Sequence, residues 1–238
     1  MKTSPNLAIR ALLCLGLVST AVAQQNTEEL KQRVLAQAQS FSPDEYAFTR
    51  TIRSETESGG KTEKKIAVEK FDPTKPANAR WTLVSIDGAP PSRDELKSHA
   101  KEAAKRRIVP GYHRLANYFG SPATATQSGG KTVFRFVSLP KGAISILDTD
   151  VSHNATAEAS VTDANGTPFV EQVRFTVKPM RVKLLMKIDK FETTARYHIG
   201  PGGKPFLMES SSDMSGSGMG QEGTIRNTTT YSDYRAVR

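Results

Sequence analysis

The sequence has almost no cysteine and no apolar run long enough to cross a bilayer, and both scarcities narrow the class of protein. Its only cysteine, Cys14, lies in an N-terminal apolar run from Ala11 to Val18. The rest of the chain has no thiol for a disulfide, a metal site or a nucleophile, so cysteine redox chemistry is excluded. The apolar run is too short for a membrane span, which favours export over anchoring.

Residues 1–23 have the pattern of a secretory signal peptide. Lys2 and Arg10 precede the apolar run, and Ala21-Val22-Ala23 supplies small residues at the cleavage site. We therefore predict cleavage before Gln24 and export to the periplasm.

The lipoprotein alternative is disfavoured because Leu13 precedes Cys14, where lipoprotein processing requires a small residue. Cleavage after residue 23 removes two of the 33 basic residues and leaves 31 against 24 acidic ones, a formal net charge of +7. Residues 24–238 contain no Pro-rich or Ser-rich linker, so we expect them to form a single domain. An exported protein rarely meets nucleic acid, and no nucleic-acid partner is expected.

Hydrophobic spacing changes along the first half of the chain from a helical to a strand period. Apolar residues at intervals near 3.6 predict an N-terminal helix over 26–41. Alternation over 46–71, interrupted by Ser58-Gly59-Gly60-Lys61, predicts a β-hairpin. The strand that starts at Trp81 has apolar residues on both faces, which predicts a central position in the sheet.

Ser92 and Glu95 form a capping box, in which each side chain satisfies a free backbone N–H of the other. A helix over 92–107 follows, rich in Lys and Arg except for a thin stripe of Leu96 and alanines. Its basic face is interpreted as solvent-exposed, and a peripheral contact with anionic lipid is the alternative.

From Lys131 onward the pattern predicts strands almost without interruption. The apolar phase switches from even to odd positions between Ile188 and Phe191. This switch requires either a tight hairpin at Asp189-Lys190 or a bulge within one long strand. The expected strands span 132–139, 144–147, 155–162, 169–177, 182–188, 191–199, 206–213 and 224–237.

No catalytic or cofactor motif is present. Two Gly-Gly-Lys-Thr segments resemble the end of a phosphate-binding loop, but Glu55 and Ala125 stand where that motif needs glycine. Asp148, Asp150 and His153 lack the fixed spacing of a metal site and are interpreted as a solvated loop. No metal and no cofactor are therefore expected. His99, His113 and His198 are interpreted as surface or packing residues.

A long antiparallel sheet with few helices has more apolar face than the helices can cover. A curved sheet resolves this excess by enclosing a cavity that holds an apolar ligand. The residues expected to line that cavity are the large apolar side chains of the strands. They are Trp81, Phe134, Phe136, Phe175, Leu184, Met186 and Tyr197.

The order of elements resembles the periplasmic lipoprotein-carrier-like (LolA-like) fold. The matching pieces are the helix from Asn26 to Phe41, the hairpin from Tyr46 to Phe71, the inserted helices from Ser92 to Phe119, and the late strands that end in Tyr231-Ser232-Asp233-Tyr234-Arg235. The resemblance implies an α+β fold, in which a curved antiparallel β-sheet forms a half-barrel with an N-terminal helix and inserted helices covering its open side. The segment 80–91 also resembles uncharacterised exported bacterial proteins.

Three functions are compatible with these patterns. The first is a non-enzymatic protein that binds a lipid, a lipidated polypeptide or another hydrophobic ligand in the half-barrel. The second is an envelope structural or regulatory protein that acts through protein contacts, and the third is a hydrolase. A half-barrel filled by its own side chains would favour the second, whereas a deep pocket with clustered acid, His and Ser groups would favour the third.

Overall fold

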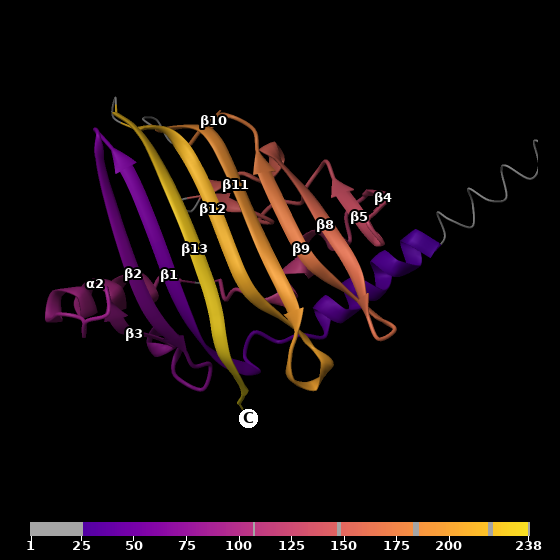
Figure 1. The fold of residues 1–238 in the computed structure, drawn as a ribbon, viewed down its shortest axis with the longest axis horizontal. Helices are drawn as coiled ribbons and strands as arrows, with labels where there is room; N and C mark the ends of the chain where they lie inside the picture. Colours follow the sequence, from indigo (N-terminus) through magenta and orange to yellow (C-terminus); the bar gives the residue numbers. More distant parts are fainter. Residues whose placement is uncertain (1–25, 107, 147–148, 183–185, 219–220, 238) are drawn as a thin grey trace, which may run out of the picture.

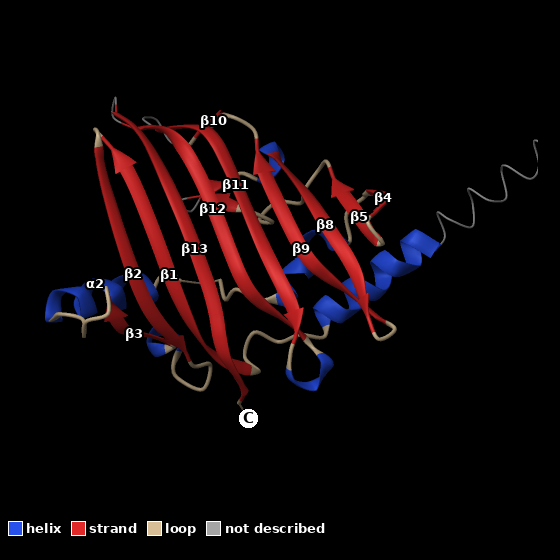
Figure 2. Ribbon diagram, in the orientation of Figure 1, coloured by secondary structure: helices blue, strands red, loops and turns tan. Residues whose placement is uncertain are grey.

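A computed structural model of the protein describes residues 26–106, 108–146, 149–182, 186–218 and 221–237. The predicted signal peptide, Cys14 and Leu184 lie outside the described residues. One large antiparallel sheet dominates the described chain, and helices lie on one face of it and at one edge (Figures 1 and 2).

Over the described residues the sheet has eleven strands, with the order β3-β2-β1-β13-β12-β11-β9-β8-β5-β4, and β10 pairs with β11. Within the described residues its end strands β3 and β4 are not paired with each other, so the sheet is an open half-barrel. The bounds are β1 Tyr46–Ser58, β2 Lys61–Phe71, β3 Trp81–Ile86, β4 Thr124–Ser128, β5 Lys131–Phe136, β8 Ala155–Ala164, β9 Thr167–Val177, β10 Met180–Arg181, β11 Met186–Ile199, β12 Pro205–Gly218 and β13 Gln221–Ala236. A separate two-stranded sheet pairs β6 Ser145–Ile146 with β7 Thr149–Asp150.

The helices are short by comparison. The described part of the N-terminal helix spans residues 26–39, two residues fewer at its end than predicted. The other helical segments are η1 Ala77–Ala79, α2 Arg93–Ala103, η2 Tyr112–Leu115, α3 Ala116–Phe119, η3 Ser152–Asn154 and η4 Pro201–Gly203. The predicted capping box is present: Ser92 Oγ accepts from the Glu95 backbone N–H, and the Glu95 carboxylate accepts from the Ser92 backbone N–H.

The α+β half-barrel predicted from the sequence is confirmed. The hairpin of β1 and β2 turns at Gly59 and Gly60, whose φ angles of 56° and 75° lie in the left-handed region that glycine tolerates. The phase switch near residue 189 is a bulge, because β11 is one long strand whose register with β12 shifts between Ile188 and Lys190.

The position predicted for the strand that starts at Trp81 is wrong. β3 is an edge strand and pairs only with β2 in the described sheet, instead of lying at its centre. Trp81 and Leu83 are buried on one side, but Val84 falls at a register shift and is 40% exposed. The apolar residues on both faces of this segment therefore reflect a bulged edge, beside which α2 packs.

One half of the inner face, defined here as the face on which the helices lie, is filled by aromatic side chains. Tyr118 and Phe119 of α3 contact Phe136 of β5 edge-on and at a tilt, with ring centroids 5.5 and 5.2 Å apart. The Tyr112 hydroxyl donates to Gln37 in the N-terminal helix and accepts from the Val170 backbone N–H. These contacts fix the helices to β5 and β9, and the buried residues form one core cluster.

The outer face carries a row of charges that runs across β2, β1, β13, β12 and β11 and continues to Arg174 on β9, which is 2.9 Å from Glu192. Ion pairs join Lys64 to Glu55 at 3.0 Å, Arg226 to Glu55 at 3.3 Å and Arg226 to Asp213 at 3.9 Å. Glu192 lies next to Asp213 in register, and this like-charged pair is balanced by other cations, including Lys190, which is 2.8 Å from Asp213. The alternation favours one strand register and keeps the outer face polar.

Candidate ligand-binding site

The inner face of the sheet is divided into rows that run across the strands, because directly paired residues of antiparallel strands point to the same side. One row is apolar and lies near the start of β11 and the end of β12, which we call the open end of the half-barrel. In it Val177 pairs with Phe191, Phe191 with Met214, and Met214 with Ile225. Phe191, Met214 and Ile225 are only half-buried. We call these three residues the apolar band.

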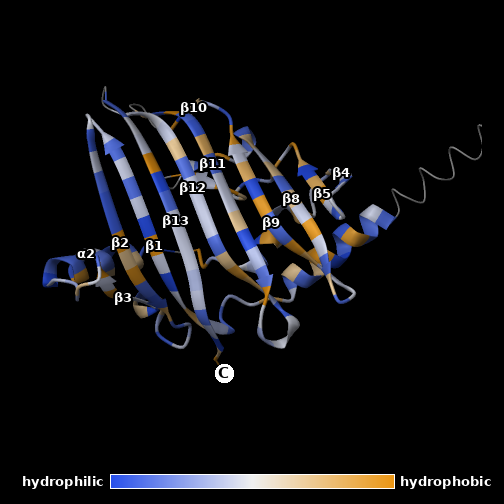
Figure 3. Ribbon diagram, in the orientation of Figure 1, coloured by the Kyte–Doolittle hydropathy of each residue, from blue (hydrophilic) through white to orange (hydrophobic). Residues whose placement is uncertain are grey.

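The neighbouring row is made of small polar residues. Thr193, Ser212, Asn227 and Ser54 are in register on β11, β12, β13 and β1, and Asn227 Nδ2 donates to Ser212 Oγ at 3.4 Å. Figure 3 shows β12 and β13 pale over much of their length, because Ser, Thr and Gly predominate there. Small side chains leave space above the sheet that bulky ones would fill, so this strip forms a shallow polar floor beside the apolar band.

A cavity of about 300 Å³ opens at the end of the inner face next to the apolar band. Its apolar lining consists of Met186, Ile188, Met214 and Ile225. This volume is at the lower end of the range for small-molecule pockets. Two methionines give the wall a polarizable, adaptable surface, which suits an apolar ligand of irregular shape.

The residues predicted to line one cavity lie in three different parts of the described structure. Phe134, Phe136 and Phe175 are brought together around α3, where Phe119 contacts Phe134 and Tyr118 contacts Phe175. Tyr197 joins the same core through an edge contact with Tyr112, centroids 5.2 Å apart. Trp81 lies in another part of the core, with its ring centroid 4.9 Å from that of Phe71. Met186 alone lines the open-end cavity, so the structure does not bring the described members of the set to one site.

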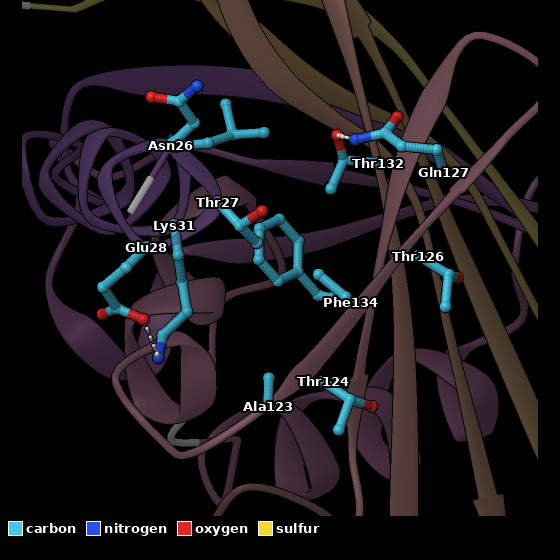
Figure 4. Close-up of a pocket in the computed structure, with 12 residues that line it drawn as sticks. Asn26, Thr27, Glu28, Lys31, Ala123, Thr124, Thr126, Gln127, Thr132 and Phe134 are labelled. Carbon is cyan, nitrogen blue, oxygen red and sulfur yellow. Dashed lines mark hydrogen bonds and ion pairs between the residues drawn. The ribbon is translucent and has the colours of Figure 1, made fainter. Parts of the chain in front are cut away.

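A second and larger cavity, of about 860 Å³, lies between the start of the N-terminal helix and β4–β5 (Figure 4). Phe134 is at its base, although this side chain is only 1% exposed. Polar groups surround it, including the Glu28–Lys31 ion pair at 3.3 Å and the Gln127–Thr132 hydrogen bond at 2.9 Å. The mixed lining makes this cavity a weaker candidate for an apolar ligand than the open-end cavity.

A buried charged cluster lies on the inner face beside Trp81. The Glu69 carboxylate, 3% exposed, accepts from Arg50 Nε at 2.7 Å and from Arg106 Nη1 at 3.0 Å to each oxygen. His99 Nε2 of α2 lies 2.9 Å from Glu69 Oε1, and the Arg50 guanidinium stacks 3.9 Å above the Trp81 ring. Burial raises the pKa of the Glu69 carboxyl, but Arg50 and Arg106 outweigh this effect and hold the pKa below its usual value.

The sequence interpretation missed this cluster, and treated His99 as a surface or packing residue. A signal was nevertheless present in the strand alternation. Arg50 has the same phase as the apolar Phe48 and Ile52 on β1, and Glu69 pairs with Arg50 in register on β2. Opposite charges on the inward phase of two adjacent strands indicate a buried ion pair.

The acidic loop does not form a metal site in the described chain. Asp150 accepts hydrogen bonds from the backbone N–H groups of Gly142 and Ser152, which organises the turn. Asp148 lies outside the described residues. Among those residues no cluster of three His, Cys, Asp or Glu side chains is placed to hold a metal ion. No helix within the described ranges has the length and apolar character needed to cross a membrane.

Two solved structures resemble this chain over most of its length. One is a LolA superfamily protein from Nitrosomonas europaea, with 11% identity, a TM-score of 0.39, and coverage of 89% of this chain and 93% of the other. The second is a DUF1329 family protein from Desulfovibrio piger, with 9% identity, a TM-score of 0.37, and coverage of 87% and 90%. The first of these structures belongs to the superfamily whose fold the sequence resembles. No protein-family model and no curated protein matches the chain.

Proposed function

We propose that this protein is an exported, non-enzymatic binding protein that holds a hydrophobic ligand, a lipid or lipidated polypeptide, at the open end of its half-barrel. The apolar band carries the proposal. Phe191, Met214 and Ile225 form one row that is half-buried and faces the same side as the packed core. An apolar row on the inner face of a sheet is normally covered by a helix, and here a cavity takes that place.

The test is binding of a fluorescent apolar probe, the methyl ester of dansylaminoundecanoic acid. Met214→Gln keeps the side-chain length but places an amide against the ligand, and should weaken probe binding about tenfold, or roughly 1.4 kcal/mol. Met208→Gln is the matched control, because Met208 lies on the same strand, is 43% exposed and does not line the cavity. If the ester does not bind the intact protein, or both variants weaken it equally, the proposal is wrong.

A role in protein contacts is the second candidate, and one observation favours it. The half of the inner face under α3 is filled: Phe119 and Phe136 are 0% exposed and Phe134 is 1% exposed. A half-barrel filled in this way has no room for a ligand in that half. The probe titration separates the two functions, since a protein-contact role predicts no saturable binding of the ester.

The basic helix α2 offers a surface for a peripheral membrane contact, which we propose as part of the ligand-binding function. Lys97 and Lys101 of α2 are exposed, and Leu96 is 44% exposed beside them. Cationic and apolar groups together on one exposed helix suit a transient approach to an anionic membrane surface, from which a carrier collects or releases its ligand. Sedimentation with phosphatidylglycerol vesicles at low and high salt tests this contact.

A further inference from the structure

One arginine of the inner face has no partner. Arg114 lies on η2, which packs against β12, and its side chain is half-buried. Within the described residues the Arg114 guanidinium makes no hydrogen bond, ion pair or ring contact, and only its backbone is hydrogen-bonded. Arg50 and Arg106, by contrast, share the carboxylate of Glu69. A guanidinium removed from much of its water and given no anion in return is costly, so its position suggests an anion supplied from outside the chain.

A buried hydroxyl without a partner lies nearby. Tyr118 is 3% exposed, and its Oη is the one buried side-chain N or O atom in the described chain that has no hydrogen-bond partner. Buried hydroxyls are nearly always paired, so an orphaned one needs an explanation. The Tyr118 ring is edge-on to Phe175 on β9, at a centroid distance of 5.2 Å, which places it at the border between the filled half and the polar strip.

Tyr197 completes the group from the sheet side. It lies on β11 and contacts Tyr112, which is the first residue of η2, the helical segment that also carries Arg114. The electrostatics agree that the three polar groups are close together. Burial lowers the pKa of Arg114, and the hydroxyls of Tyr197 and Tyr118 act against that shift. Burial likewise raises the pKa of Tyr118, so its hydroxyl is a hydrogen-bond donor throughout the neutral range.

We propose that Arg114, with the hydroxyls of Tyr118 and Tyr197, binds the anionic head group of an amphiphile. This inference rests on the proposed function and names its ligand class: a carboxylate or phosphate joined to an apolar tail. On β11, Tyr197 is six residues from Phe191 of the apolar band, a distance of about 20 Å along the strand. A head group at Arg114 therefore leaves the tail to lie over the small-residue strip and reach Met214 and the open-end cavity.

The experiment compares dansylaminoundecanoic acid with its methyl ester, which have the same tail and differ in charge. The acid should bind the wild-type protein at least about tenfold more tightly, the difference expected for one charge-assisted hydrogen bond. Arg114→Gln should lower the affinity for the acid to that for the ester and leave the ester unchanged. Arg53→Gln removes the same charge from an exposed outer-face position and should alter neither affinity.

Tyr118→Phe is a second test, and its expected result differs from that of a purely structural role for the Tyr118 hydroxyl. Because the hydroxyl has no partner in the unbound protein, its removal should leave thermal stability unchanged or higher, while the acid binds several-fold more weakly. Equal affinities for acid and ester overturn the head-group assignment but leave the proposed function standing, whereas binding of neither overturns both. Displacement of the acid by inorganic phosphate alone would assign the site to a free anion and overturn the amphiphile assignment.

Discussion

His99 on α2 and Glu69 on β2 are joined across the edge of the sheet, with 2.9 Å between Nε2 and Oε1. Both side chains are polar, so hydrophobic burial does not account for this contact. α2 buries only Ala103, so apolar contact contributes little to its attachment. Arg106, just beyond the end of the helix, adds two hydrogen bonds to the same carboxylate. One buried glutamate therefore joins this helix and the segment after it to the sheet.

Replacing this glutamate should be strongly destabilising. Glu69→Gln removes the negative charge and leaves Arg50 and Arg106 without their counter-ion in a site that is 3% exposed at the glutamate. Breaking a buried ion pair from one side typically costs about 3 to 5 kcal/mol, to be measured here by urea unfolding. Glu102→Gln is the control, because its pair with Lys105 is exposed, and it should leave unfolding unchanged. A loss as small as that of the control would contradict the role assigned to Glu69.

The same carboxylate should contribute to acid sensitivity. Its pKa in the folded protein is held below the usual value near 4.5, so its stabilising effect is complete above that value. The effect should be lost as the pH falls from about 4.5 through the lower folded pKa, since the unfolded chain takes up the proton first. Urea unfolding at several pH values should show that the unfolding free energy falls less steeply toward acid pH for Glu69→Gln than for wild type. The same dependence on pH in both proteins would show that other carboxylates determine the acid sensitivity.

Two Phe→Ala variants separate core filling from ligand binding. Phe136 is 0% exposed and contacts Tyr118 and Phe119, so Phe136→Ala should cost about 3 to 5 kcal/mol of unfolding free energy. Phe191 is half-buried in the apolar band. Compared with Phe136→Ala, Phe191→Ala should therefore lower the unfolding free energy less and lower the affinity for the dansyl ester more. Calorimetry and probe titration measure both quantities, and the reverse ranking would place the ligand in the aromatic core instead.

Much of the fold is predictable because periodicity records which face of an element is buried. The 46–71 alternation and its Gly-Gly turn predict β1 and β2 correctly, and the phase switch near residue 189 predicts an irregularity that the structure resolves as a bulge. The order of strands depends on long-range pairing, which periodicity does not record. Apolar residues on both faces of β3 therefore suggested a central strand, whereas a bulge and a neighbouring helix explain them at an edge.

The site was less predictable, for a related reason. Large apolar side chains are the signal for a cavity and equally the signal for a core, and most of the predicted set fills the core around Tyr118. The apolar band became visible only once register aligned Phe191, Met214 and Ile225 across three strands. Arg114 is distinguished by the partner it lacks among the described residues, which the sequence alone does not reveal.

Export remains a prediction from the sequence, since residues 1–23 lie outside the described residues. Expression of the full chain in a Gram-negative host should yield a periplasmic protein that begins at Gln24, because Ala21 and Ala23 occupy the small-residue positions of the cleavage site. N-terminal sequencing checks the position. Recovery of an intact Met1, or of a lipid attached to Cys14, would be incompatible with it.

The bulge in β11 depends on the absence of a side chain on the opposite strand. A Cβ added to Gly216 would lie 2.1 Å from the backbone oxygen of Lys187 and 3.1 Å from the Cα of Ile188, and backbone atoms of a paired strand have little freedom to move away. Gly216→Ala should therefore destabilise the protein by about 1 to 3 kcal/mol and weaken probe binding, since Gly216 also lines the open-end cavity. Gly120→Ala, whose added Cβ would meet only Leu35 Cδ2 at 3.7 Å, should be tolerated. Equal stability of the two variants would show that the bulge adjusts freely and is not held by Gly216.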